Sequence, residues 1–236
     1  MRDNTTFCIH ILGSEIFFTI FNHSGSLSTC SYNIHQCPQI FLCILIGVSC
    51  ASLSTLRFDK LIHWRQVERG DQVVHVKELQ FVKDGIVHII ELISILFIFD
   101  NLHGRGTTVW KGVKMNKRQK NWGKENVVMK DSWINPLRKY MEGKILSILN
   151  EYRIEGIPRL IHEQHIRTSH PISPSNKVNN STHFLWAPLA HHERGSYYLR
   201  VLSRIITEPV RDLITEFSCL GELLVAFLNY VVGKLV

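Results

Sequence analysis

Glycine, lysine and glutamate residues in the middle of the chain have the order of a phosphate-binding site. Gly104 and Gly106 lie in a turn, Lys130 ends an apolar segment, and Glu142 follows on a segment with helical periodicity. Glycine lets backbone N–H groups approach phosphates, lysine holds them as a point charge, and glutamate orients the lysine. Each signal is weak alone, because strand-ending lysines and helical glutamates are usually just solvated. Their order favours a nucleotide site.

The elements that would position these residues can be read from periodicity. Strands are expected at residues 96–102, 107–114 and 126–133, where apolar segments are separated by glycine-rich or polar turns. The apolar positions of residues 137–152 recur at helical spacing, which predicts a helix that carries Glu142. The Gly-x-Pro sequence at 156–158 is expected to end this helix. The separation of Lys130 and Glu142 then leaves room for a strand–helix ion pair.

The flanking segments predict a mixed α+β chain. Two β-rich segments surround a turn at 13–14, a second turn follows at 23–25, and residues 33–52 form an apolar helix with Pro38 near its first turn. Valines at 73–76 indicate a strand, whereas periodicity leaves residues 87–100 open as a buried strand or helix. Further elements are expected as follows: a long loop or insertion at 165–193, a strand at 196–207, a connector at 207–217 and a helix at 220–236.

The expected C-terminal helix is apolar on most of its faces. Such a helix needs other elements to bury it, and the small elements before it offer limited cover. We therefore expect an incompletely buried helix at 220–236 that is prone to self-association. We interpret it as a sign that the chain is truncated.

Composition excludes several classes of protein. The 236 residues carry a net charge of +7, with basic residues concentrated at 111–130. Only Trp110 and Trp122 offer base stacking there, so we expect a solvated hairpin turn and no nucleic-acid partner. The six cysteines form no C-x-x-C pair, which argues for a reduced, intracellular protein (cytoplasmic or nuclear) without a zinc site. The apolar segments at 40–53 and 86–99 are too short to span a bilayer, so no membrane association is expected.

Several segments resemble the fungal-type protein kinase family. GRGTTVW at 104–110 is similar to its glycine loop, and VVMKDSW at 127–133 resembles its Lys-Asp-Ser-Trp strand end, the most specific match. EGKILSIL at 142–149 resembles the helix with the paired glutamate, and EGIPRLIHEQ at 155–164 the following Gly-x-Pro strand.

The resemblance extends to both sides of this region. RFDK at 57–60 is similar to a Gly-x-Asp segment, and residues 204–233 resemble the interlobe connector and first large-lobe helix. Upstream, Asn22-His23-Ser24-Gly25 stands where the family has Asp-Arg-Ser-Gly. The match is thinnest at 60–100 and 165–193.

The resemblance implies an α+β, incomplete protein-kinase-like fold, with an antiparallel small-lobe sheet and one helix. It implies three parts: an N-terminal α+β segment at 1–64, a connecting region at 65–95, and small lobe, connector and first large-lobe helix at 96–236. ATP and Mg²⁺ are the implied cofactors, with Gly104, Gly106, Lys130 and Glu142 as ATP-binding residues. The implied acceptor is a protein Ser or Thr hydroxyl.

The sequence also departs from the family pattern. It contains no His-Arg-Asp loop and no Asp-Phe-Gly segment, so no catalytic or metal-binding residue is assigned, and Asp212 is the only aspartate near its end. Thr108 and Val109 follow where many kinases keep a third glycine. Three hypotheses stay open: a truncated kinase or pseudokinase that is inactive alone, a non-catalytic interaction module built on a small lobe, and an active kinase whose remaining half lies in a longer transcript.

Overall fold

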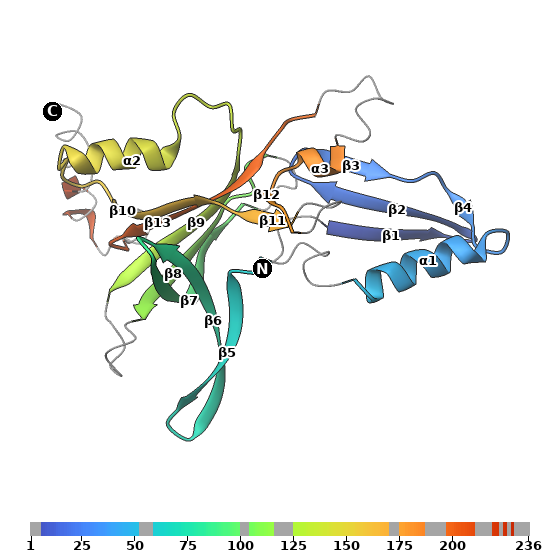
Figure 1. Cartoon of the computed structure of the whole chain (residues 1–236), viewed down its shortest axis with the longest axis horizontal. Helices are drawn as coiled ribbons and strands as arrows, with labels where there is room; N and C mark the ends of the chain where they lie inside the picture. The colour runs from blue at the N-terminus through green and yellow to red at the C-terminus, as the bar shows by residue number, and fades with distance from the viewer. Residues whose placement is uncertain are drawn as a thin grey trace.

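The computed structural model of the chain is an α+β structure of mostly antiparallel strands. It describes residues 6–51, 59–99, 104–115, 125–169, 175–186, 197–210, 219–221, 224–225 and 228. The described strands form a four-stranded sheet, a seven-stranded sheet and a two-stranded ribbon, and the two larger sheets lie at opposite ends of the molecule (Figure 1). Within these ranges, no helix is long and apolar enough to cross a membrane.

The four-stranded sheet is formed by the first part of the chain. Its strands are β1 (Thr6–Leu12), β2 (Glu15–Asn22), β3 (Gly25–Ser28) and β4 (Tyr32–Asn33). The expected turn between β1 and β2 is present, with Gly13 at a φ of +61°, a conformation that glycine adopts without steric cost. Helix α1 (Pro38–Ser49) follows with the proline in its first turn, as expected, but it begins five residues later and ends three residues earlier than the predicted 33–52.

The seven-stranded sheet contains the Lys-Asp-Ser-Trp segment and the strand after the Gly-x-Pro sequence, two of the segments that resemble the kinase family. Its order is β10-β13-β9-β8-β7-β6-β5, and every neighbouring pair is antiparallel. The strands are β5 (Ile62–Arg69), β6 (Gln72–Lys83), β7 (Ile86–Ile98), β8 (Thr108–Met115), β9 (Asn126–Ile134), β10 (Arg159–His165) and β13 (Val201–Glu208). Residues 87–100, left open by periodicity, are therefore largely strand. The segment expected to connect two parts, 65–95, runs through β5, β6 and β7 of this same sheet; the three-part division stays a prediction.

Two expectations about loops and helix ends were wrong. Helix α2 (Glu142–Glu151) begins five residues later than predicted, because the Asn135 side chain accepts the Leu137 N–H over 2.9 Å and forms a turn that competes with the helix. It ends at Glu151, one residue before the predicted end, and Arg153 follows with a φ of +54°. The expected loop at 165–193 contains a ribbon and a short helix: β11 (Arg167–Ser169), β12 (Lys177–Asn179) and α3 (His183–Trp186).

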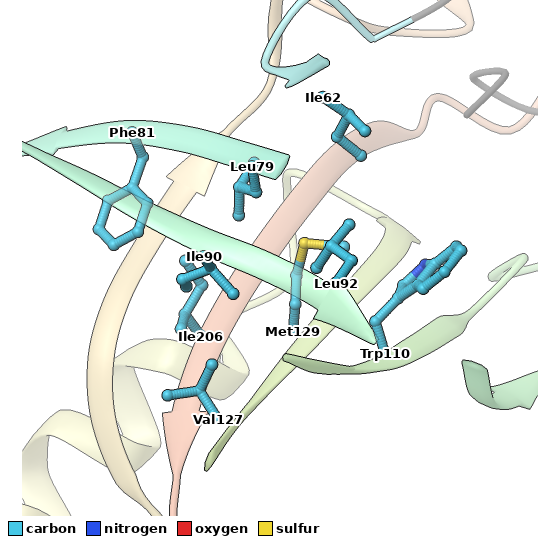
Figure 2. Packing of buried hydrophobic residues seen from close by; sticks show 9 residues of the cluster. All are labelled: Ile62, Leu79, Phe81, Ile90, Leu92, Trp110, Val127, Met129 and Ile206. Atoms are coloured by element: carbon cyan, nitrogen blue, oxygen red, sulfur yellow. The ribbon is translucent and has the colours of Figure 1, made fainter. Parts of the chain in front are cut away.

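The seven-stranded sheet rolls so that strands near its two edges meet. Phe81 of β6 stacks on His162 of β10 with ring centroids 4.7 Å apart, and Lys83 Nζ donates to the Ile161 carbonyl oxygen over 2.7 Å. The roll encloses nine buried apolar side chains (Figure 2): Ile62, Leu79, Phe81, Ile90, Leu92, Trp110, Val127, Met129 and Ile206. Burial of each such side chain stabilises by about 1.5–3 kcal/mol, so this core fixes the strands that carry the candidate site.

The C-terminal segment is described at only a few positions. Helical conformation is present at residues 220–221, 224–225 and 228, and its apolar side chains there are 57–66% exposed: Leu220, Leu224, Val225 and Leu228. The prediction of an incompletely buried helix is confirmed at these positions. Asp212, most of the expected connector and most of the basic turn lie outside the described residues, although β8 and β9 on either side of that turn form the expected hairpin.

Candidate nucleotide site

Lys130 lies in the middle of the rolled sheet. Its strand, β9, is hydrogen-bonded on both sides, so that Lys130 stands opposite Val109 of β8 and Ile205 of β13. A residue flanked by two paired strands has a fixed backbone. The lysine side chain therefore projects from a rigid support, as a phosphate-binding cation requires.

Glu142 is the first residue of α2 and contacts Lys130 with both carboxylate oxygens. The Lys130 Nζ lies 2.8 Å from Oε1 and 2.7 Å from Oε2. The first turn of a helix favours a negative charge, which also suits Glu142 there. The predicted ion pair is thus confirmed, although the glutamate begins the helix instead of lying inside it. The Lys130 and Glu142 side chains are 31% and 47% exposed, so the pair contributes only about 0–1 kcal/mol to stability.

The Lys-Asp-Ser-Trp segment divides its side chains between the two faces of β9. Lys130 and Ser132 line a pocket, whereas Asp131 is buried and accepts two hydrogen bonds from Arg204, of 2.7 and 2.6 Å. The same guanidinium donates to Asp59 over 2.6 Å. Burial by itself would lower the pKa of Arg204, but the two carboxylates outweigh it and raise the pKa, so the arginine stays charged. This network fixes the strand behind Lys130.

The glycine loop between β7 and β8 is held by backbone contacts. The Trp133 N–H donates to the Arg105 carbonyl oxygen over 2.6 Å, and the Phe99 N–H donates to the Thr107 carbonyl oxygen over 2.8 Å. Gly104 and Gly106 both have positive φ values, of +106° and +46°, which explains glycine at each position. The predicted loop therefore lies beside the lysine strand. Whether it binds phosphates stays a prediction.

The N-terminal sheet also contacts the glycine loop. A Cβ at Gly106 would overlap the ring of His23, which is buried and lies against Trp133 with ring centroids 5.4 Å apart. The Gly104 N–H donates to the His23 carbonyl oxygen over 3.3 Å. Sequence reasoning noted His23 only as a departure from the family pattern. It did not identify His23, Asp59 or Arg204 as supports of the site, and no periodicity signals them.

A small pocket links the loop to the Lys130–Glu142 pair. Its lining comes from the loop, β9, α2 and the segment before it, β10 and β13: Arg105, Thr107, Lys130, Ser132, Ile134, Arg138, Met141, Glu142, Glu163, Ser203 and Ile205. Three cationic side chains face two carboxylates, so the lining is net positive. Glu163, which sequence reasoning missed, lies so close to Gly143 that a Cβ there would overlap its carboxylate unless the Glu163 side chain moved. Across the described ranges, this pocket included, no group of three His, Cys, Asp or Glu side chains gathers that could hold a metal ion.

A sequence model of the family described as fungal protein kinase matches residues 6–235. This chain belongs to that family. The match includes the four-stranded sheet as well as the rolled sheet, so the family's sequence pattern extends over the His23 and Asp59 contacts. No curated protein and no solved structure matches the chain.

Proposed function

We propose that this fungal protein kinase chain holds the phosphates of ATP at Lys130. The observation that carries the proposal is the contact of Lys130 with both oxygens of Glu142, on a strand beside the glycine loop. In phosphoryl transfer such a lysine holds the α- and β-phosphates and the glutamate orients it. Arg105 and Arg138 add positive charge to the same pocket. The five antiparallel strands β7, β8, β9, β13 and β10, with α2 between β9 and β10, support a small-lobe layout.

The pocket fits phosphates in charge but not in volume. It encloses only about 20 Å³, room for about one water molecule. Entry of a nucleotide therefore requires the glycine loop to move from its contacts with His23 and Trp133. We expect weak ATP binding for this reason. Bound ATP would supply the phosphoryl group.

We further propose that the 236 residues do not transfer phosphate by themselves. The sequence holds no His-Arg-Asp loop to provide a base and no Asp-Phe-Gly segment to bind metal. Labelled phosphate should not enter a generic protein substrate. Transfer that Lys130→Met abolishes would show that this part of the proposal is wrong.

The phosphate site is tested by calorimetric titration with ATP and with adenosine. Lys130→Met should weaken ATP binding at least about tenfold, a loss of about 1.4 kcal/mol, and leave adenosine binding and the melting temperature unchanged. Lys111→Met is the matched control, because Lys111 lies on neighbouring β8 outside the pocket lining. Equal ATP binding by wild type and Lys130→Met would refute the site.

A second candidate function, an interaction module, rests on the exposed C-terminal residues. We infer that the exposed leucines 220, 224 and 228 drive association, because their four-residue spacing is that of one helical face and exposed apolar patches mark interfaces. Changing Leu220, Leu224 and Leu228 together to Lys should turn an associating chain into a monomer in sedimentation velocity without lowering its melting temperature. Leu12→Lys, at a site 68% exposed in β1, is the control. A wild-type chain that is already monomeric excludes this function.

A further inference from the structure

A second pocket lies where β6 and β7 separate. Their pairing runs from Lys83–Ile86 to Lys77–Leu92 and stops there. Beyond that point, residues 72–76 of β6 pair only with β5, and residues 93–98 of β7 pair only with β8, within the described sheet. We call these two diverging segments the fork. Figure 1 shows the β5–β6 hairpin projecting away from the rest of the sheet.

The fork has a physical cause in β7. The register between β7 and β8 shifts between Leu92 and Ser94, and again between Ile95 and Phe97. Such bulges bend a strand and increase its twist, so β7 turns away from β6 where their ladder ends. Two strand edges then face each other without hydrogen-bonding partners in the sheet, and unpaired edges are templates for an added strand.

The pocket at the base of the fork has the size and lining of a binding site. Its volume is about 360 Å³, and it is lined by residues of four strands: Trp64, Arg69, Val74, His75, Val76, Lys77, Glu91, Leu92, Ile93 and Trp110. Known ligand pockets begin at about 300 Å³ and combine apolar walls with a few polar groups. Along β7 the apolar surface continues, because Ile93, Ile95 and Phe97 are 46–52% exposed.

Two buried polar atoms in this lining have no hydrogen-bond partner among the described residues. Glu91 is only 2% exposed, and its Oε1 accepts from Arg69 over 2.5 Å while Oε2 has no donor. Trp110 is 6% exposed, and its Nε1–H has no acceptor. An unsatisfied buried group costs about 1–3 kcal/mol. One needs a donor and the other an acceptor, and a peptide backbone supplies both.

The charges in the lining indicate which peptide fits. Arg69 and Lys77 face a single carboxylate, Glu91, which Arg69 already pairs. The Lys77 Nζ lies 4.9 Å from the Trp64 ring centroid and 4.8 Å from that of Trp110, and no carboxylate pairs with it in the described part of the chain. The Lys77 ammonium therefore lacks an anionic partner among the described residues, and the net positive lining favours a peptide that carries an acidic residue.

We propose that the fork binds an extended peptide segment of a partner protein, with apolar side chains at alternate positions and one acidic residue. The segment adds as a strand to residues 93–98 of β7. Its backbone donates a hydrogen bond to Glu91 Oε2 and accepts one from Trp110 Nε1. Its apolar side chains contact Ile93 and Ile95, and its carboxylate pairs with Lys77. This is recognition by strand addition, in which the backbone ladder gives affinity and the side chains give specificity.

The probe is a fluorescein-labelled, capped eight-residue peptide of alternating valine and threonine with one central aspartate. Fluorescence anisotropy with the full chain should show saturable binding, several-fold weaker when asparagine replaces the aspartate and weaker still with lysine. N-methylation of alternate peptide residues should abolish binding, because it removes the ladder donors. Lys77→Gln should make the aspartate and asparagine peptides bind equally.

Ile95→Lys tests the surface on the protein side. It should weaken the aspartate peptide about tenfold or more, whereas Val82→Lys, at a 59% exposed position on the paired part of β6, should not. Thermal melts verify that both variants fold. No saturable binding up to about 1 mM, binding that survives N-methylation, or preference for the lysine peptide would overturn the proposal. Dimerisation that Ile95→Lys abolishes, without peptide binding, would assign the fork to a second copy and overturn it too.

Discussion

Arg204 is a buried cation whose removal should be costly. It is 1% exposed and shares its guanidinium between Asp131 and Asp59, both buried. Arg204→Met would leave two carboxylates buried without a cation. We expect the free energy of unfolding in urea at pH 7 to fall by about 3–5 kcal/mol, the usual cost of breaking a buried ion pair. This is a large part of the 5–15 kcal/mol typical of a domain.

The charge explanation can be separated from simple loss of packing. Adding Asp131→Asn and Asp59→Asn to Arg204→Met removes the uncompensated charges and should restore part of the stability. Arg159→Met is a surface control: Arg159 pairs with Glu208 but is 71% exposed, so about 0–1 kcal/mol is expected. If the triple variant is no more stable than Arg204→Met alone, the buried charges are not the cause.

At the scale of elements, Asn150 ties the end of α2 to the start of β10. Its Nδ2 donates to the Pro158 carbonyl oxygen over 3.0 Å, and its Oδ1 accepts the Leu160 N–H over 2.6 Å. α2 has a single buried residue, Gly143, so this connection does much to place the helix that carries Glu142. Asn150→Ala should lower the free energy of unfolding by about 1–3 kcal/mol, because both backbone groups lose their partner. Urea denaturation measures it.

Asn150→Asp keeps the acceptor for Leu160 and loses only the donor to Pro158. It should therefore be less destabilising than Asn150→Ala. In addition, if the helix position matters for the Lys130–Glu142 pair, Asn150→Ala should weaken ATP binding relative to adenosine. Equal stability of the wild type and both variants would show that α2 is held by other contacts.

At the scale of the whole molecule, the stability of the protein should depend on pH, because the rolled sheet partly buries His162. Burial lowers the pKa of His162, which stacks on Phe81, and the positive charges of Lys83, His88 and Arg204 lower it further, while a hydrogen bond with Gln164 opposes them. The folded state therefore disfavours the protonated ring. The neutral His162 ring makes its full contribution to stability above the pKa of an unfolded histidine, about 6.5. This contribution is lost as the pH falls through the lower pKa of the folded state.

Thermal melts between pH 7.5 and 5 should show the wild type losing stability on acidification. The His162→Gln variant should lose less stability over the same range. The difference between the two slopes should not exceed about 1.4 kcal/mol of unfolding free energy per pH unit, the value for one proton. His63→Gln, at an exposed position of β5, should keep the wild-type slope. A steeper slope for His162→Gln would contradict the predicted direction.

Local sequence patterns predict the elements around the site. Apolar segments between turns predicted β8 and β9, glycines marked the loop before them, and helical spacing predicted α2. These signals are local, since each depends on a few neighbouring residues. Together with the resemblance at 127–133, they predicted the Lys130–Glu142 pair. Helix ends were less well predicted, because the Asn135 turn competes with helical spacing.

Contacts between distant segments determine what supports the site and where strands of the sheet separate. Arg204 and Asp59 are 145 residues apart, and the contact of His23 with Gly106 joins the N-terminal sheet to the glycine loop. The two-residue periodicity of a β-strand indicates which side chains share a face of the sheet. It does not indicate which strands become neighbours or how far their hydrogen-bonded pairing extends. The rolling of the sheet and the bulges in β7 determine those features, so neither the buried Arg204 network nor the fork could be read from the sequence alone.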